Sequence, residues 1–104
     1  MSNLTKLVDK VEKIKAEFGL DNTDLMLLAI VSEKWDENRD VRVTDVTRKL
    51  NAGVGSPANV HYRLTKDLVD LKLVALKLNP EDAREKFVIK GKKFDALDNY
   101  IGAL

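Results

Sequence analysis

The stretch Ser56-Pro57-Ala58-Asn59-Val60-His61-Tyr62-Arg63-Leu64 contains the clearest helix start in the chain. Serine is a favoured N-cap residue, and proline is favoured at the first helical position. We therefore expect a helix from Ser56 to about Leu71. At about 100° per residue, Val60, Leu64, Leu68 and Leu71 fall within an arc of about 80°. This arc should pack on the core, since each such side chain stabilises the fold by roughly 1.5–3 kcal/mol when buried.

The opposite face of this helix carries short, polar and aromatic side chains, and its first turns lack a carboxylate. Asparagine can pair with adenine, and threonine can bond a base edge while its methyl touches thymine. Tyrosine can bond a phosphate, and lysine can neutralise one. Asp67 and Asp70 are expected away from the centre line of this face. The free face consists of Ala58, Asn59, Tyr62, Thr65, Lys66 and Val69, flanked by His61 and Arg63. An ordinary solvated helix face is the alternative.

Three helices are expected before this one. Apolar residues spaced three and four apart predict an amphipathic helix from Leu4 to Phe18, which Gly19 ends. An almost wholly apolar helix should run from Leu25 to about Trp35, with possible N-caps within residues 21–24. The third is a short helix from Asp45 to Leu50, capped by Thr44 or Asp45. The stretch Val41-Arg42-Val43 alternates like a very short strand, and Asn51-Ala52-Gly53-Val54-Gly55 predicts a compact turn.

A hairpin and a last helix are expected after Leu71. Leu73 to Leu78 and Arg84 to Ile89 predict two strands around the turn-forming residues 79–83, and a helix should follow from about Lys92 to Leu104. This order predicts a mainly α fold with a small β-hairpin wing (α+β), a winged helix-turn-helix with additional N- and C-terminal helices. We expect one domain over residues 1–104: an N-terminal helix in 1–19, a winged-helix core in 24–91 and a C-terminal helix in 92–104.

The charge is unevenly distributed, although its net value is only +1. Residues 1–40 hold six Lys/Arg and nine Asp/Glu, whereas residues 41–94 hold twelve and six. A basic middle segment favours a nucleic-acid-facing module. Patchy charge in a short chain is the alternative.

The sequence carries no recognisable pattern for catalysis or metal binding, and its carboxylates fit helix caps or solvated faces. There is no cysteine, which excludes disulfides, thiolate catalysis and Cys-based zinc sites, and His61 has no second histidine to share a metal. The stretch Gly53-Val54-Gly55-Ser56 lacks the Lys-Ser/Thr of a phosphate loop. We expect no enzyme activity, no cofactor and no metal. No apolar run approaches the roughly 20 residues of a membrane span, and the start lacks a signal-peptide pattern, so we expect a cytoplasmic protein, nucleoid-associated in a prokaryotic or viral setting.

The segment from about Leu25 to Leu97 resembles the MarR-type transcriptional regulators. The Ser56 helix runs through Leu71-Lys72-Leu73-Val74 into a strand, as a recognition helix runs into the first wing strand. The stretch Asn79-Pro80-Glu81-Asp82-Ala83-Arg84 resembles their wing tip, with its Asp-Pro-x-Asp-x-Arg pattern, and Gly91 stands at the glycine before the next helix. The resemblance implies that Arg84 enters the minor groove, where a narrow groove concentrates negative potential, and that Asp82 orients it. It also implies dimerisation through the N- and C-terminal helices.

Together these features predict a sequence-specific regulator of transcription that binds double-stranded DNA as a homodimer. The recognition helix, about 57–71, would lie in the major groove and the wing, about 74–89, at the minor groove. A protein–protein interaction module and a non-specific architectural or replication-associated nucleic-acid binder are the alternatives, and a small-molecule effector is left open. The candidate DNA-binding residues are Thr44, Ser56, Ala58, Asn59, His61, Tyr62, Arg63, Thr65, Lys66, Asp82, Arg84 and Lys86. The candidate dimer-interface residues are Leu4, Leu7, Val11, Ile14, Phe18, Leu97, Ile101 and Leu104.

Overall fold

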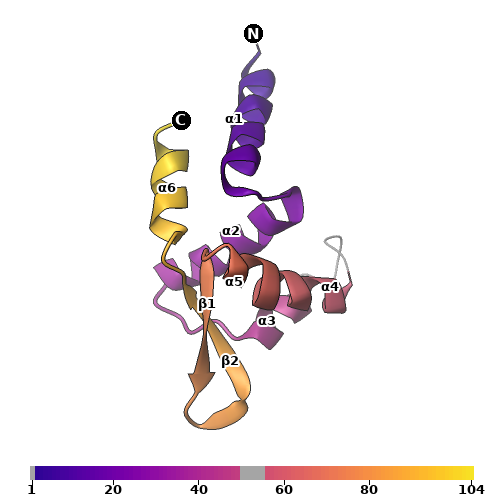
Figure 1. Ribbon diagram of the computed structural model, residues 1–104, viewed down its shortest axis with the longest axis vertical. Helices are drawn as coiled ribbons and strands as arrows, with labels where there is room; N and C mark the ends of the chain where they lie inside the picture. The colour runs from indigo at the N-terminus through magenta and orange to yellow at the C-terminus, as the bar shows by residue number, and fades with distance from the viewer. Residues whose placement is uncertain (1, 50–55) are drawn as a thin grey trace.

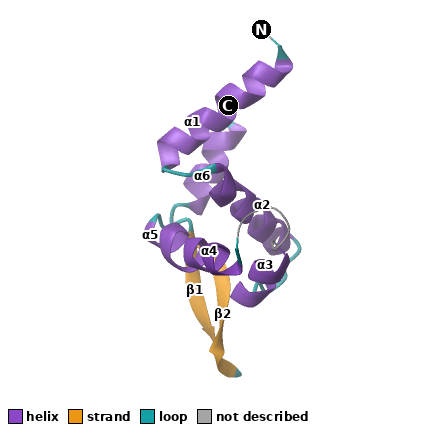
Figure 2. Cartoon of the chain, turned by 90° about the vertical axis from the view of Figure 1, so that its right-hand side faces the viewer, coloured by secondary structure: helices purple, strands orange, loops and turns teal. Residues whose placement is uncertain are grey.

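The computed structural model describes residues 2–49 and 56–104 as six helices, one π-helical turn and a two-stranded antiparallel hairpin. The molecule is elongated, with extents of 52 × 27 × 25 Å. The first and last helices project together from one end, and the hairpin projects from the other (Figures 1 and 2). The predicted fold, mainly helical with a hairpin wing, is confirmed.

Helix α1 (Asn3–Phe18) begins one residue before the predicted Leu4, with Ser2 as its N-cap, and ends at the predicted Phe18. The Ser2 side chain accepts a hydrogen bond from the Thr5 N–H at 3.1 Å. At the other end Gly19 adopts a left-handed conformation, with φ of 70°, and its N–H donates to the Lys15 carbonyl. Glycine takes this conformation without steric cost, so the predicted helix end is confirmed.

Helix α2 (Asn22–Asp36) begins three residues before the predicted Leu25. Asp21 is its N-cap and Asp24 completes a capping box, because each carboxylate accepts a hydrogen bond from the other residue's backbone N–H, at 2.9 and 3.1 Å. The reciprocal bonds satisfy two N–H groups that a helix start otherwise leaves free. The polar residues 22–24 are therefore the first turn of the helix and not the loop before it.

Helix α3 (Val43–Lys49) also begins earlier than predicted, so Thr44 and Asp45 lie inside it and do not cap it. The short strand expected at residues 41–43 is reduced to a single bridge between Arg42 and Phe87, beside a 2.7 Å hydrogen bond from Val88 N–H to the Val41 carbonyl. Leu50 and the turn predicted at 51–55 lie outside the described residues.

The recognition helix, residues 57–70, is continuous but not regular. It consists of α4 (Pro57–Tyr62), a π-helical turn η1 (Arg63–Asp67) and α5 (Leu68–Asp70). The predicted start is confirmed, since the Ser56 side chain accepts from the Asn59 N–H at 3.2 Å and Pro57 is the first helical residue. Within η1 the Leu68 N–H reaches back five residues to the Arg63 carbonyl, which marks a wider turn.

The core-facing side of this helix carries the four residues that the sequence predicts. Val60, Leu64 and Leu68 are all 0% exposed, and Leu71 is partly buried and packs against the same core. The predicted core-facing arc is therefore confirmed, although the regular helix assumed for it is interrupted by η1.

The hairpin pairs β1 (Val74–Asn79) with β2 (Asp82–Lys90), so the turn is tighter than the predicted 79–83. The register passes from Leu78 opposite Lys86 to Asn79 opposite Asp82, which leaves residues 83–85 as a bulge. Lys72, between the recognition helix and β1, has a left-handed φ of 62°. Gly91 lies against it, and a Cβ there would come within 2.2 Å of the Lys72 carbonyl oxygen.

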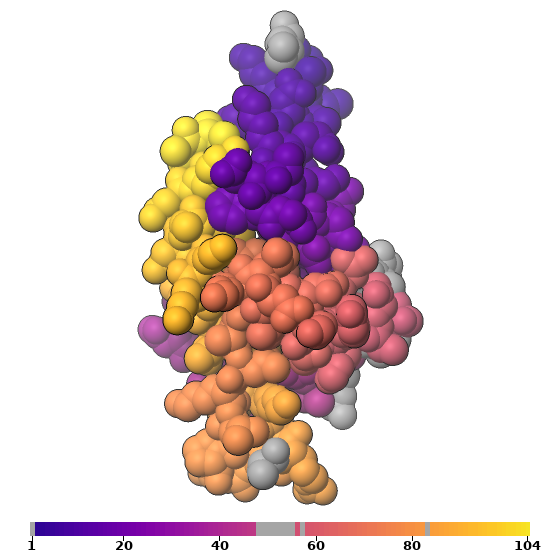
Figure 3. Space-filling model, viewed as in Figure 1, coloured from indigo at the N-terminus to yellow at the C-terminus, as the bar shows by residue number. Residues whose placement is uncertain are grey.

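The core lies where the recognition helix, α2, α3 and the hairpin meet. Helix α6 (Phe94–Gly102), shorter than the predicted 92–104, closes it with Phe94 and Leu97, and Trp35 packs edge-on against Phe94 at 5.1 Å between ring centroids. Figure 3 shows, on one face, the recognition helix across the middle of the molecule and the hairpin projecting beyond it. The buried apolar residues are Ile14, Leu20, Leu27, Leu28, Val31, Val41, Val43, Val46, Val60, Leu64, Leu68, Leu73, Val74, Val88, Phe94 and Leu97.

Candidate nucleic-acid interface

The outward face of the recognition helix carries an exposed row spaced four residues apart. Tyr62, Lys66 and Asp70 are all exposed, Tyr62 to 55%. Lys66 Nζ lies 3.2 Å from Asp70 Oδ2, one turn further along the helix. Both side chains of this pair are about three-fifths exposed, and such pairs contribute little energy. Lys66 can therefore exchange this partner for a phosphate.

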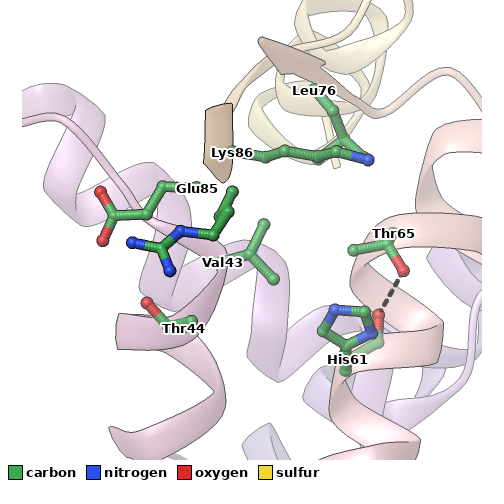
Figure 4. Close-up of a pocket in the computed structure, with 8 residues that line it drawn as sticks. Val43, Thr44, His61, Thr65, Leu76, Glu85 and Lys86 are labelled. Carbon is green, nitrogen blue, oxygen red and sulfur yellow. Dashed lines mark hydrogen bonds between the residues drawn. The ribbon is translucent and has the colours of Figure 1, made fainter. Parts of the chain in front are cut away.

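A groove of about 400 Å³ separates the recognition helix from the wing (Figure 4). Val43 and Thr44 border it from α3, and His61 and Thr65 from the recognition helix, where Thr65 Oγ1 donates to the His61 carbonyl at 2.7 Å. The wing side is formed by Leu76, Arg84, Glu85 and Lys86. The structure thus brings together Thr44, His61, Thr65, Arg84 and Lys86, five of the twelve DNA-binding candidates, around one groove.

The wing tip presents Arg84 to solvent. Its side chain is 91% exposed, and Asp82 Oδ1 accepts hydrogen bonds from the Arg84 backbone N–H at 3.0 Å and from its Nε at 3.3 Å. These bonds bias the direction of a long side chain and so reduce the entropy that it loses when it binds a ligand. The pairing of Asp82 with Arg84 implied by the resemblance is present, and the minor-groove contact stays a prediction.

Glu85 is a wing residue that the sequence analysis missed. Asn79, 9% exposed, donates from Nδ2 to Glu85 Oε2 at 3.1 Å and accepts the Glu81 N–H at 2.9 Å. The second oxygen, Glu85 Oε1, lies 3.5 Å from Arg42 Nη1 at the start of α3. The carboxylate that borders the groove is therefore engaged by two partners and ties the wing bulge to α3. Only the turn residues around Asn79 gave a signal of this arrangement.

Arg63 turns away from the candidate interface. Its Nη1 donates to Asp21 Oδ2 and, at 3.2 Å, to Asp24 Oδ1, and its side chain is 22% exposed. The hydrogen bond to Asp21 is the main reason that the pKa of Arg63 lies above its ordinary value. The structure therefore gives Arg63 partners within the chain, and we no longer count it among the DNA contacts. The helical pattern placed Arg63 at the border of the free face. It gave no sign of the two carboxylates, because they are about 40 residues away in the sequence.

The remaining candidates on the recognition helix keep an outward position. Ala58 and Asn59 are exposed in the first turn of α4, where Ser56 acts as the cap.

The terminal helices divide the dimer-interface candidates into two groups. Ile14 and Leu97 are buried in the chain's own core, and Val11 and Phe18 are half-buried, Phe18 edge-on against Tyr100 at 5.4 Å. The exposed group is large and apolar: Leu4 at 71%, Leu7 at 58%, Ile101 at 41% and Leu104 at 37%, joined by Val8 at 50%. Only this exposed group remains available to a second chain.

The described residues contain neither a membrane-spanning helix nor a metal-binding cluster. No helix among residues 2–49 and 56–104 has the length and apolar content to cross a membrane. Within the same residues, His, Asp and Glu side chains form no group of three or more that could hold a metal ion.

Comparisons with known proteins place the fold. No family model matches the sequence, and no curated protein matches it either. Among solved structures, a MepR mutant from S. aureus bound to an oligodeoxyribonucleotide superposes with a TM-score of 0.71 at 13% identity, over 95% of this chain and 67% of that one. AbsC, a MarR family transcriptional regulator from Streptomyces coelicolor, gives 0.67 at 19%, over 95% and 63%. The adhesin competence repressor AdcR from Streptococcus pyogenes gives 0.61 at 24%, over 98% and 72%.

These similarities confirm the MarR-type winged-helix resemblance at the level of the fold. The chain spans about two thirds of the length of these structures.

Proposed function

We propose that this chain, which has the fold of MarR-type winged-helix regulators, binds double-stranded DNA and regulates transcription without catalysing a reaction. The observation that carries the proposal is the groove between the recognition helix and the wing, which brings Lys86 and Arg84 together with His61 and Thr65. The carboxylate within it, Glu85, already has two partners in the chain. The cations at the rim of this groove can therefore bind the phosphates of a DNA backbone.

The recognition helix would lie in the major groove. Its outward first turns offer Asn59 and Thr65 for base edges and Tyr62 and Lys66 for phosphates, a division between reading and positioning that is usual in DNA interfaces. The wing would lie along the adjacent backbone with Arg84 in the minor groove, where a narrow groove attracts a guanidinium. Thr44, Ser56, Ala58, His61, Asp82 and Lys86 complete the proposed contact surface.

The chain would act as a homodimer. Helices α1 and α6 project from the end of the molecule opposite the wing (Figure 1), and the exposed apolar residues Leu4, Leu7, Ile101 and Leu104 belong to them or to the end of the chain that follows α6. Pairing two copies there would cover these side chains and leave both recognition helices free. A two-fold dimer reads two half-sites related by symmetry, about one helical turn apart.

Fluorescence anisotropy with a random duplex pool, at low and at physiological salt, tests the proposal. Binding should be salt-dependent, and replacing a phosphate-contacting cation should lower the slope of log K against log salt by about 0.9 for each copy of the chain in the complex. We expect this result for Lys66→Ala and Arg84→Ala, and weaker binding for Tyr62→Ala. Lys13→Ala, an exposed lysine of α1, is the matched control and should bind as the unsubstituted chain does.

Selection and sequencing of the bound fraction then separate the alternatives. An enriched palindrome supports a dimeric regulator. A specific-to-random affinity ratio near one indicates a non-specific architectural binder, since specific readers gain about 10³ or more. No affinity for duplex at low salt would contradict the proposal and favour the protein–protein interaction module.

A further inference from the structure

Arg63 connects the middle of the recognition helix to the start of α2. It is the first residue of η1, and its guanidinium bonds two carboxylates that precede it by 42 and 39 residues. The start of α2 lies beside the recognition helix (Figure 1). The Asp21–Asp24–Arg63 cluster is therefore a long-range polar contact on the side of this helix that faces the protein.

The capping box holds both carboxylates in place independently of Arg63. In the capping box, Asp21 Oδ1 accepts the Asp24 N–H and Asp24 Oδ2 accepts the Asp21 N–H. The second oxygen of each residue, Asp21 Oδ2 and Asp24 Oδ1, accepts Arg63 Nη1. Each carboxylate thus has one oxygen on the helix end and one on Arg63. The acceptors cannot turn away without breaking the cap of α2.

The apolar contacts of the recognition helix do not fix the rotation of the helix about its own axis. Val60, Leu64 and Leu68 are aliphatic, and hydrophobic contact is non-directional. A buried ion pair adds little net stability but can select one arrangement among several. Arg63 Nε is buried without a hydrogen-bond partner, so the side chain makes its two Nη1 bonds while the Nε donor stays unsatisfied.

We propose that Arg63 is the positioning residue of the recognition helix. Through Asp21 and Asp24 it fixes the rotation of the helix about its own axis, so that Tyr62 and Lys66 face outward, and it makes no contact with DNA itself. This inference rests on the proposed function.

The test variant is Arg63→Met/Asp24→Asn. Methionine keeps the apolar stem, and asparagine keeps an oxygen for the Asp21 N–H, so the cap of α2 can persist while the ion pair is lost. The matched control is Arg39→Met, which removes an exposed pair with Glu37 of 3.3 Å in the segment between α2 and α3. Circular dichroism checks that each variant folds.

The first readout compares two duplexes, the selected sequence and the random pool. A misplaced helix loses base contacts and keeps its phosphate charges. We expect affinity for the selected duplex to fall about tenfold, the equivalent of one mismatched base pair. Affinity for the random pool should change less than about twofold, with an unchanged salt slope. A salt slope lowered by about 0.9 on the random pool would mean that Arg63 contacts a phosphate and would overturn the proposal.

The second readout needs no DNA. Because the chain has no cysteine, spin labels can be placed at Asn59→Cys in α4 and Glu33→Cys in α2, two exposed positions, and the distance between them measured. We expect the distance distribution to broaden when Arg63→Met/Asp24→Asn is added and to stay narrow with Arg39→Met. An unchanged distribution would overturn the proposal. If the double variant unfolds, Arg63→Lys takes its place. Lysine keeps the charge but not the fork of two carboxylate bonds, so the distance distribution should still be broader than that of the unsubstituted chain.

The two proposals can fail separately. If the unsubstituted chain binds no duplex, the proposed function is wrong, and the spin-label distances still decide whether Arg63 positions the helix.

Discussion

Helix α1 and the recognition helix have the same kind of apolar pattern and opposite surroundings. In the recognition helix Val60, Leu64 and Leu68 are 0% exposed, whereas Leu4 and Leu7 of α1 are 71% and 58% exposed. An apolar period of three to four residues shows which side chains share a face. It does not show what covers that face: the chain covers the row in the recognition helix but only the later part of the one in α1, where Ile14 is buried.

The difference has an energetic meaning. The buried row stabilises the folded monomer, because its area leaves water when the chain folds. The exposed group of α1 and α6 contributes nothing until another surface meets it, and adjacent exposed apolar side chains are typical of interaction sites. Substitutions in the first row should change folding, and substitutions in the second should change assembly.

The largest effect is expected for Leu4→Glu/Leu7→Glu. If a second copy covers these side chains, losing two of them from each copy should cost about 3–6 kcal/mol per copy, at roughly 1.5–3 kcal/mol each, and so weaken the dimer by more than about a hundredfold in dissociation constant. Sedimentation equilibrium should show a monomer with the helical content of the unsubstituted chain. Lys10→Glu, an exposed position of α1, makes the same change in net charge and should stay dimeric. An unchanged dimer in the double variant would remove the proposed interface.

Leu64→Ala should have the next largest effect, on folding itself. Leu64 is 0% exposed at the middle of the recognition helix, and truncating a buried leucine costs about 2–5 kcal/mol. Denaturant unfolding followed by circular dichroism measures the loss. Leu4→Ala is the control, with an expected change within about 0.5 kcal/mol at concentrations where the chain is monomeric. Equal losses for the two variants would contradict the contrast between the helices.

Local signals in the sequence predicted where elements begin and end. Ser56, Pro57 and Gly19 act through their own backbone and side chains, so their effect on a helix end is visible without the rest of the fold. The alternation around residues 74–79 and 82–90 likewise predicted the hairpin.

Long-range contacts could not be predicted in this way. The partners of Arg63 are about 40 residues distant, and those of Glu85 come from the turn and from α3. The π-helical turn in the middle of the recognition helix was not predicted either, because a constant angle per residue was assumed along the whole helix. Of the candidate interface, the residue types were predictable and their arrangement around a groove was not.

Asp21→Asn tests the ion pair that joins the start of α2 to Arg63 of the recognition helix. Burial raises the pKa of the Asp21 carboxyl, but the Asp24 N–H and the Arg63 guanidinium outweigh it, so the pKa lies below the ordinary 3.8. A carboxyl of this kind stabilises the fold above its unfolded pKa and loses that contribution as the pH falls through its folded pKa. Burial and the charge of Asp21 raise the pKa of Asp24, whose contribution has the opposite sign and is lost as the pH rises through its folded pKa.

The asparagine variant should therefore be less stable near neutral pH and not in acid. Asparagine keeps the N-cap acceptor and removes the charge, and because the Asp21 side chain is half exposed the loss should be about 1 kcal/mol or less. Thermal unfolding at pH of about 7 and about 2 measures it, and the difference from the unsubstituted chain should vanish at the lower pH. A constant difference would mean that the cap, and not the ion pair, is affected.

The smallest effect is expected where each helix ends. Both end at a left-handed residue, Gly19 with φ of 70° after α1 and Lys72 with φ of 62° after the recognition helix. This conformation costs a residue with a Cβ about 1–2 kcal/mol, and glycine avoids that cost but loses more backbone entropy on folding, about 0.5–1 kcal/mol. Lys72→Gly should thus stabilise the chain by about 0.5 kcal/mol, and Gly19→Ala should destabilise it by a similar amount. Denaturant midpoints measure both, with the exposed Lys10→Ala as control. A destabilised Lys72→Gly would mean that the Lys72 side chain makes a contact outweighing its backbone strain, and the two helix ends would then differ in more than their residue type.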